Sequence, residues 1–188
     1  MFAVPLAEGA ELRPLEPWQA EEFLAHMDRA RDNVNPYVPW ATRSTDLESA
    51  TATLQGFADR KAADARQLFG IWLDGTLVGG VMFVAFDAEQ GNCEIGAWTE
   101  PAGQGRGLIS AATARLLDYA FTERGLYRAE WHNSSVNPRS RAVAQGLGFQ
   151  LEGVLRKSAL YRGERLDYEV WAILAPEWAE KRGGSDRA

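Results

Sequence analysis

The chain has 188 residues, 46% of them hydrophobic and 24% charged, and a formal net charge of −6. This composition predicts one soluble domain with a sizeable core, and no apolar run reaches the roughly 18 residues that a membrane-spanning helix needs. The negative charge argues against a general nucleic-acid binder, and the lone Cys93 excludes an internal disulfide and favours a reducing, cytoplasmic compartment.

The first half of the chain predicts one strand, two helices and then three strands. Thr45 or Asp46 can cap the second helix. The dipeptide Asp74-Gly75 is a strong signal for a two-residue hairpin turn between two apolar runs. From the periodicity we predict a strand at 11–13, helices at 18–31 and from 45 or 46 to about 66, and strands at 68–73, 77–86 and 92–99.

The second half predicts a helix, a strand, a helix and a closing strand pair. Asn137 can cap a helix that has Pro138 in its first position, and Gly148 suits the left-handed position that ends it. The strand–helix–strand unit at 92–132 predicts a right-handed crossover between parallel neighbouring strands. We predict a helix at 108–121, strands at 126–132, 150–161 and 165–174, a single domain over 1–180 and a disordered tail at 181–188.

A glycine-rich loop precedes the helix at 108–121. Gly103, Gly105 and Gly107 fall within five residues. Glycines allow close backbone approach, and the first amides of a helix lack intrahelical acceptors, so this segment predicts a phosphate site. It lacks the Gly-Lys-Ser/Thr of a P-loop and the GxGxxG spacing of a dinucleotide fingerprint. The alternative is that these glycines only form a tight turn.

The loop sequence QGRGLI, Gln104–Ile109, resembles the Q/R-x-x-G-x-G/A signature of the GNAT superfamily of acetyl-CoA-dependent N-acetyltransferases. The surrounding blocks EIGAWTEP, NPRSRAVAQGLGF and GERLDYEVWAIL resemble the RimJ/RimL-like branch, which acetylates ribosomal-protein N-termini. The resemblance extends from Leu12 to about Trp178 and departs at the last signature position, where Ile109 replaces Gly or Ala. It implies an α/β (α+β) fold with a mixed, mostly antiparallel sheet, a central splayed parallel strand pair and helices on both faces.

The resemblance further implies acetyl-CoA as co-substrate and no metal. Loop amides would bind its pyrophosphate, and Arg106 would add a charge-assisted bond. The pantetheine arm would lie along the strand that contains Trp98, where an amide would polarise the thioester carbonyl. Trp98 either lines that slot or packs in the core, and Asn137 bonds the pantetheine, caps its helix or does both. The implied cofactor-binding residues are Ala97, Trp98, Thr99, Gln104, Gly105, Arg106, Gly107, Leu108, Ile109, Asn137 and Ser140.

Acyl transfer to an amine needs a base and benefits from an acid at the leaving thiolate. Ser140 resembles the serine that protonates the thiolate in this branch, and its alternative role is a plain helix-start serine. Glu94 and Glu130 are the candidate bases, and each is alternatively a satisfied carboxylate in the cleft lining, since a water chain can also remove the proton. Strand alternation places Arg128 and His132 on the face of Glu130, and the histidine is expected to be solvated or structural.

The acceptor site is implied by aromatic residues. Tyr37 and Trp40 resemble its walls, with a core role as the alternative, and Tyr161 borders the last hairpin. The favoured acceptor is a protein or peptide N-terminus, and the alternative is a small amine such as an aminoglycoside, an amino acid or a polyamine. A preference for a longer acyl chain and a non-catalytic acyl-CoA-binding module also stay open. Nucleic acid and membranes are not expected partners, while a homodimer is compatible with the resemblance.

Overall fold

The computed structural model describes residues 3–34, 43–161 and 163–185. Within this part, eight strands form one sheet in the order β1-β2-β3-β4-β5-β6-β8-β7. The pairs β1–β2, β2–β3, β3–β4, β6–β8 and β7–β8 are antiparallel, whereas β5 and β6 run parallel. The predicted mixed, mostly antiparallel sheet with one parallel pair is therefore confirmed. The chain divides into two compact units, Met1–Val84 with Gly96–Thr113 and Ala85–Ile95 with Ala114–Ala188.

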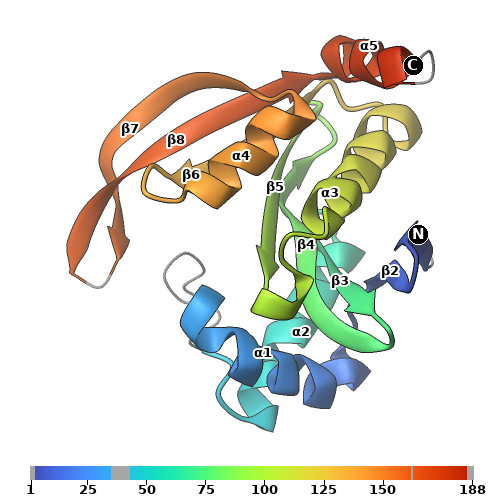
Figure 1. Ribbon diagram of the computed structural model, residues 1–188, viewed down its shortest axis with the longest axis vertical. Helices are drawn as coiled ribbons and strands as arrows, with labels where there is room; N and C mark the ends of the chain where they lie inside the picture. The colour runs from blue at the N-terminus through green and yellow to red at the C-terminus, as the bar shows by residue number, and fades with distance from the viewer. Residues whose placement is uncertain (1–2, 35–42, 162, 186–188) are drawn as a thin grey trace. The chain divides into compact units, whose positions relative to one another are not determined.

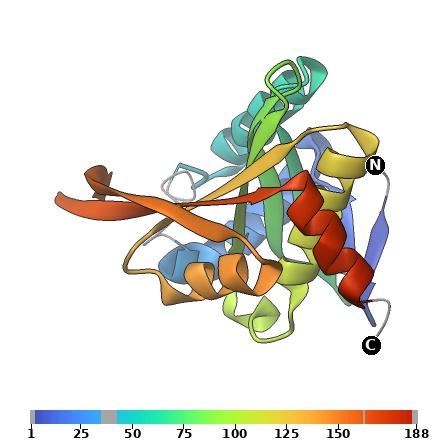
Figure 2. The same cartoon turned by 90° about the horizontal axis from the view of Figure 1, so that it is seen from above.

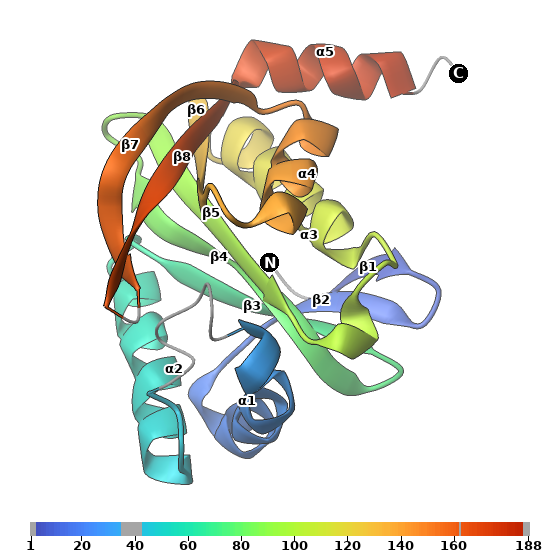
Figure 3. The ribbon, with the colours of Figure 1, turned by 60° about the vertical axis from the view of Figure 1, so that its left-hand side comes forward.

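The first unit packs two helices against antiparallel strands. Figures 1 and 3 show α1 and α2 side by side. Buried apolar residues at helical spacing, among them Phe23 and Met27 of α1 and Leu54 of α2, form one core cluster with Trp72 and Met82 of the strands. The elements are β1 (Val4–Ala7), β2 (Ala10–Pro14), α1 (Ala20–Val34), α2 (Leu47–Ala62), β3 (Gln67–Leu73), most of β4 (Thr76–Asp87) and the end of β5 (Asn92–Thr99).

The second unit contains a long hairpin, β7–β8, beside β6. Figure 2 shows this hairpin as a two-stranded ribbon that extends at the end opposite α5. Helix α4 packs along β6, where Trp131 contacts Phe149 with ring centroids 6.3 Å apart. The elements are the start of β5, β6 (Arg128–Ser134), α4 (Pro138–Leu147), β7 (Gln150–Tyr161), β8 (Glu164–Leu174) and α5 (Ala175–Ser185). Helix α3 (Leu108–Asp118) begins in the first unit and ends in this one.

The helix boundaries follow local capping chemistry. The Asp46 side chain accepts from the Ser49 amide at the start of α2, and Asn137 accepts from the Ser140 amide at the start of α4. Pro138 occupies the first turn of α4, and Gly148 ends it with φ of 90°. The predictions for both N-caps and for this C-terminal glycine are confirmed.

Two terminal elements differ from the sequence expectation. Strand β1 was not predicted, because Pro5 cannot donate to a ladder and demotes the segment to an edge position. We expected a disordered tail from residue 181, whereas α5 continues to Ser185. The helix is anchored where the Trp178 indole nitrogen donates to Asp118 Oδ1 at 2.8 Å and Arg182 bonds the other oxygen at 3.1 Å. These contacts join residues about sixty positions apart, so no local sequence pattern predicts them.

The single-domain prediction itself stays a prediction. No helix in the described ranges is both long and apolar enough for a membrane span.

Two glycines give a matched test of the packing in the first unit. A Cβ at Gly80 of β4 would collide with the Trp98 ring and lie 2.5 Å from the Phe69 carbonyl oxygen, whereas a Cβ at Gly56 of α2 would meet nothing within 4 Å. We expect Gly80→Ala to lower the free energy of unfolding by roughly 1–3 kcal/mol, and Gly56→Ala to raise it by roughly 0.5–1 kcal/mol. Urea unfolding of both variants measures this, and a Gly80→Ala variant as stable as the parent would contradict the packing.

Candidate active site

The parallel strands β5 and β6 share a short ladder. Their pairs run from Asn92↔Arg128 to Ile95↔Trp131, although β5 continues to Thr99 and β6 to Ser134. Backbone groups beyond the last pair are not used by the β5–β6 ladder. Such carboxyl ends of parallel strands are the usual place for ligands in sheets of this kind.

The loop after β5 has the geometry of an anion site. Gly105 and Gly107 adopt φ of 72° and 71°, and a Cβ at either position would meet nothing within 4 Å. The first helical bond of α3 runs from the Ala111 amide to the Gly107 carbonyl, so the amides of Leu108–Ser110 precede it. Open space beside two left-handed glycines and a helix start suits a pyrophosphate, as in acetyl-CoA. The side chain of Leu108 is buried, so its amide is the group available to a ligand.

Arg106 lies in this loop with an exposed side chain. Its Nε donates to the Ala102 carbonyl at 3.1 Å, which bends the side chain back over the preceding turn, Pro101–Gly103. Gln104 and Ile109 are both partly buried, at either end of the two-glycine segment. The six predicted loop residues therefore form one continuous segment at the start of α3.

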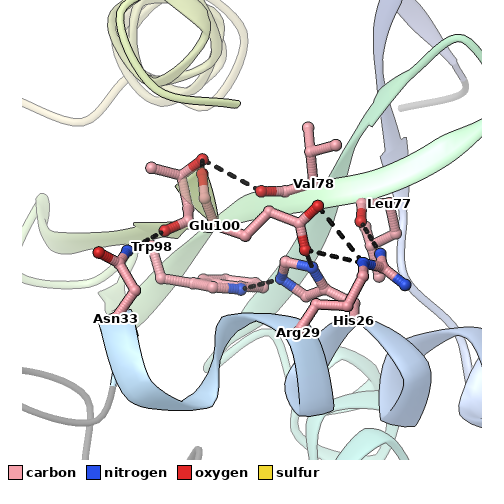
Figure 4. Close-up of polar contacts among 8 residues, drawn as sticks. His26, Arg29, Asn33, Leu77, Val78, Trp98 and Glu100 are labelled. Atoms are coloured by element: carbon pink, nitrogen blue, oxygen red, sulfur yellow. Dashed lines mark hydrogen bonds and ion pairs between the residues drawn. The ribbon is translucent and has the colours of Figure 1, made fainter. Parts of the chain in front are cut away.

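Trp98 of β5 is held in a buried polar network, drawn in Figure 4. Its indole N–H donates to His26 Nε2 at 3.0 Å, so the imidazole proton lies on Nδ1, which donates to Glu100 Oε2 at 3.0 Å. Arg29 donates to the same carboxylate oxygen at 3.1 Å and to the Leu77 carbonyl at 2.8 Å. The Trp98 side chain is 4% exposed within the core cluster, which favours the core alternative for this residue.

The network also fixes the end of β5. Asn33 of α1 donates to the Thr99 carbonyl at 2.9 Å, and the Thr99 hydroxyl donates to the Val78 carbonyl at 3.1 Å (Figure 4). Burial lowers the pKa of His26 to about 4, against the opposing effect of Glu100. The imidazole is therefore neutral at pH 7 and acts as a structural hydrogen-bond bridge beside residues 97–99.

The second unit brings both candidate bases together. Glu94 and Glu130 form one rung of the β5–β6 ladder. His132 lies between them, with Nε2 2.9 Å from Glu130 Oε2 and Nδ1 3.7 Å from Glu94 Oε1. Arg128 donates from Nε to the other Glu130 oxygen at 2.9 Å and forms a bidentate pair with Glu152 at 2.7 and 2.5 Å. The predicted shared face of Arg128, Glu130 and His132 is confirmed.

Ser140 and Asn137 lie together at the start of α4. The Ser140 amide donates to Asn137 Oδ1 at 3.2 Å, and the Ser140 hydroxyl oxygen accepts from the Trp131 indole N–H at 2.9 Å. An Oγ that accepts a hydrogen bond keeps its own proton available for donation to another group. This is the arrangement that a proton donor requires.

A buried carboxylate fixes α4 to the strands. Glu169 of β8 accepts from Asn133 at 3.0 Å, from the Trp171 indole at 3.2 Å and from Arg141 Nε at 3.1 Å. The Arg141 guanidinium is the main cause of a lowered pKa at Glu169. Because Arg141 follows Ser140 directly, this ion pair positions the serine.

The predicted acceptor residues contribute little to this picture. Tyr37 and Trp40 lie outside the described residues, and so does the side chain of Tyr161, whose backbone ends β7. Within the described ranges, no group of His, Cys, Asp and Glu side chains is arranged to hold a metal ion.

Comparison with known proteins decides the family. The profile of the acetyltransferase (GNAT) domain matches residues 10–150. The chain belongs to the GNAT acetyltransferase family. YdaF of Bacillus subtilis, for which a ribosomal N-acetyltransferase activity has been suggested, is 28% identical over 179 residues, which cover 95% of this chain and 98% of YdaF. The ribosomal-protein-serine acetyltransferase of Escherichia coli is 28% identical over 71% of this chain and 74% of its own length.

A solved structure agrees with the sequence relatives. Mycobacterium smegmatis RimJ in complex with CoA-disulfide superposes on this GNAT chain with a TM-score of 0.81 and 27% identity, over 89% of this chain and 83% of RimJ. The predicted membership and the N-acetyltransferase activity that it carries are thereby confirmed. Acetyl transfer thus becomes the reaction against which the roles of these side chains are assessed.

Sequence reasoning missed three features of this GNAT site. It expected His132 to be solvated or structural and did not place the imidazole between the two candidate bases. It also missed the Trp131 bond to Ser140 and the bond of Arg141 to the buried Glu169. The alternation R-A-E-W-H in β6 did signal that Arg128, Glu130 and His132 share a face, but contacts with other elements depend on strand register and helix packing.

The buried His26 gives a pH-dependent stability. Above its ordinary pKa of 6.5, neither the folded nor the unfolded imidazole carries a proton. Below pH 6.5 the unfolded chain binds a proton on His26, whereas the folded chain binds it only near pH 4. The free energy of unfolding therefore decreases as the pH is lowered from 6.5 to 4. We expect a loss of about 3 kcal/mol between pH 6.5 and 4. Urea unfolding at several pH values measures it, and His26→Gln should flatten the slope. Equal slopes in the two proteins would contradict the assignment.

Proposed function

We propose that this GNAT enzyme transfers the acetyl group of acetyl-CoA to the α-amino group of a protein or peptide. The cofactor assignment is supported by the glycine loop that leads from β5 into α3. In this loop Gly105 and Gly107 both have positive φ values and open space at their Cβ positions. The acceptor is proposed from the relatives, since YdaF and the E. coli enzyme are both linked by name to ribosomal proteins. We also propose a cytoplasmic location, because a lone buried thiol suits a reducing compartment.

The proposed cofactor contacts divide by chemistry. The pyrophosphate accepts hydrogen bonds from backbone amides of Gln104–Ile109, and Arg106 is the cation of the loop that can pair with its charge. The pantetheine amides take backbone groups of Ala97–Thr99 and the Asn137 side chain. Bound acetyl-CoA supplies an activated acyl group whose carbonyl is polarised by a backbone amide.

The proposed chemical roles follow from the second unit. Ser140 donates a proton to the leaving thiolate, since its oxygen already accepts from Trp131. The face of the Glu94–Glu130 rung supplies the charge that attracts an ammonium and the basic groups that deprotonate it. Tyr37, Trp40 and Tyr161 remain proposed acceptor contacts.

The glycine loop is tested by the introduction of a negative charge into it. Gly107→Asp should weaken acetyl-CoA binding by roughly 100-fold or more, because a carboxylate would repel the pyrophosphate at the helix start. Gly125→Asp is the matched control, since Gly125 also has a positive φ, 68°, and open space around its Cβ position. Titration calorimetry measures both. Loss of affinity in the control as well, or in neither variant, would argue against the loop as the binding site.

The acceptor is tested by thiol release with peptides that begin with Ser or Ala, set against spermidine and an aminoglycoside. Cys93 is the single cysteine, and burial raises its pKa to about 12, so the protein adds little thiol background. We expect the highest kcat/KM with peptides. Ser140→Ala should lower kcat by roughly 100-fold with unchanged acetyl-CoA affinity. Higher efficiency with the small amines would overturn the acceptor proposal, and binding without turnover of any amine would indicate an acyl-CoA-binding module.

A further inference from the structure

Glu130 is already occupied on both carboxylate oxygens. One oxygen accepts from Arg128 Nε at 2.9 Å and the other lies 2.9 Å from His132 Nε2. The two oxygens are thus engaged by a guanidinium on one side and by an imidazole on the other. Glu130 is therefore poorly suited to take a proton from substrate and well suited to orient the imidazole.

The orientation of His132 leaves its second nitrogen for chemistry. When Nε2–H donates to Glu130, Nδ1 carries a lone pair. This nitrogen lies 3.7 Å from Glu94 Oε1, which is too long for a direct hydrogen bond and is a separation at which both atoms could approach one ammonium group. The side chain is 22% exposed, so it is neither sealed in the core nor fully solvated.

We infer that His132 is the general base that deprotonates the acceptor amine, with Glu130 as its positioning residue and Glu94 as the ammonium-binding carboxylate. This inference rests on the proposed function and names the group that performs one of its steps. An imidazole suits the role because its protonation changes near neutral pH, where a general base works best.

The charged and titratable groups around His132 come from every strand beside it. Arg128 and Glu130 lie on β6, Glu94 on β5, and Glu152 of β7 reaches the set through Arg128. Burial and then the negative charge of Glu94 raise the pKa of Tyr168 of β8, so its phenol stays neutral and can donate a hydrogen bond. The set holds one histidine between carboxylates, with Arg128 as the balancing cation.

The proton balance of the reaction is complete with these groups. His132 Nδ1 takes one proton from the ammonium, and the neutral amine forms the N–C bond as the C–S bond of the thioester breaks. The amine nitrogen then releases its second proton to solvent, and His132 returns the proton that it took to solvent as well. Ser140 gives its proton to the thiolate and regains one from solvent. The sum converts an ammonium and acetyl-CoA to an amide, CoA thiol and one released proton.

The chain offers an unusually clean test, because His26 and His132 are its two histidines. Imidazole signals in NMR should distinguish His26, whose ring stays neutral above pH 5, from His132. The titration midpoint of His132 should coincide with the acid limb of kcat/KM for the peptide acceptor. Glu130→Gln should move both to lower pH, since removal of a neighbouring negative charge disfavours the imidazolium.

Substitution separates catalysis from structure. His132→Ala should lower kcat roughly 100-fold, keep acetyl-CoA affinity, lose the acid limb and regain activity with added imidazole. Glu94→Gln should mainly raise KM for the amine, and Glu180→Gln, an exposed charge on α5, should change nothing. An unchanged kcat in His132→Ala, or loss of the acid limb in Glu94→Gln instead, would overturn the inference while acetyl transfer by the parent protein stands. Absence of turnover in the parent would overturn the proposed function first.

Discussion

The four-rung parallel ladder between β5 and β6 is the constraint on which the chemistry of the second unit depends. Strand alternation sends Cys93 and Trp131 to one side of these rungs and the Glu94–Glu130 rung to the other. The buried side carries the indole that binds Ser140, and the partly exposed side carries the carboxylates around His132. One short ladder therefore sets both the acid and the base of the proposed reaction, and a one-residue slip would exchange the two faces.

Each unit also contains a buried carboxylate that holds a helix to its strands. In the first unit Glu100 accepts from His26 and Arg29 of α1, and in the second Glu169 accepts from Arg141 of α4. Removal of the partner side chains would leave a buried carboxylate without its charge-assisted hydrogen bonds, so these bonds resist a shift of the helix. The same pairs lie next to the working parts, beside the end of β5 and beside Ser140. Stability and positioning are thus provided by the same bonds.

Much of the fold followed from local signals, whereas much of the site did not. Capping and positive φ are decided by a few adjacent residues. The sequence alone therefore predicts the roles of Asn137, Gly148 and the glycine loop. Family resemblance then supplied the mixed, mostly antiparallel sheet with its parallel strand pair. The surroundings of His132 could not be predicted, because they include Glu94, 38 positions earlier, and depend on the register that places the two close together. Trp98 was ambiguous for the same reason, since alternation alone cannot say which face of a strand the helices cover.

The electrostatics of the His132 set explain why it contains a cation as well as two carboxylates. Negative charge attracts an ammonium, but it equally favours the imidazolium, which cannot accept a proton. Arg128 offsets this conflict by neutralising Glu130 directly, and Glu152 fixes Arg128 by a bidentate pair that raises the pKa of the guanidinium and lowers that of Glu152. Glu94 is left as the carboxylate on the Nδ1 side of the ring. In this proposal the two carboxylates have different tasks at opposite nitrogens of one side chain: Glu130 orients the imidazole at Nε2, and Glu94 attracts the substrate at the basic Nδ1.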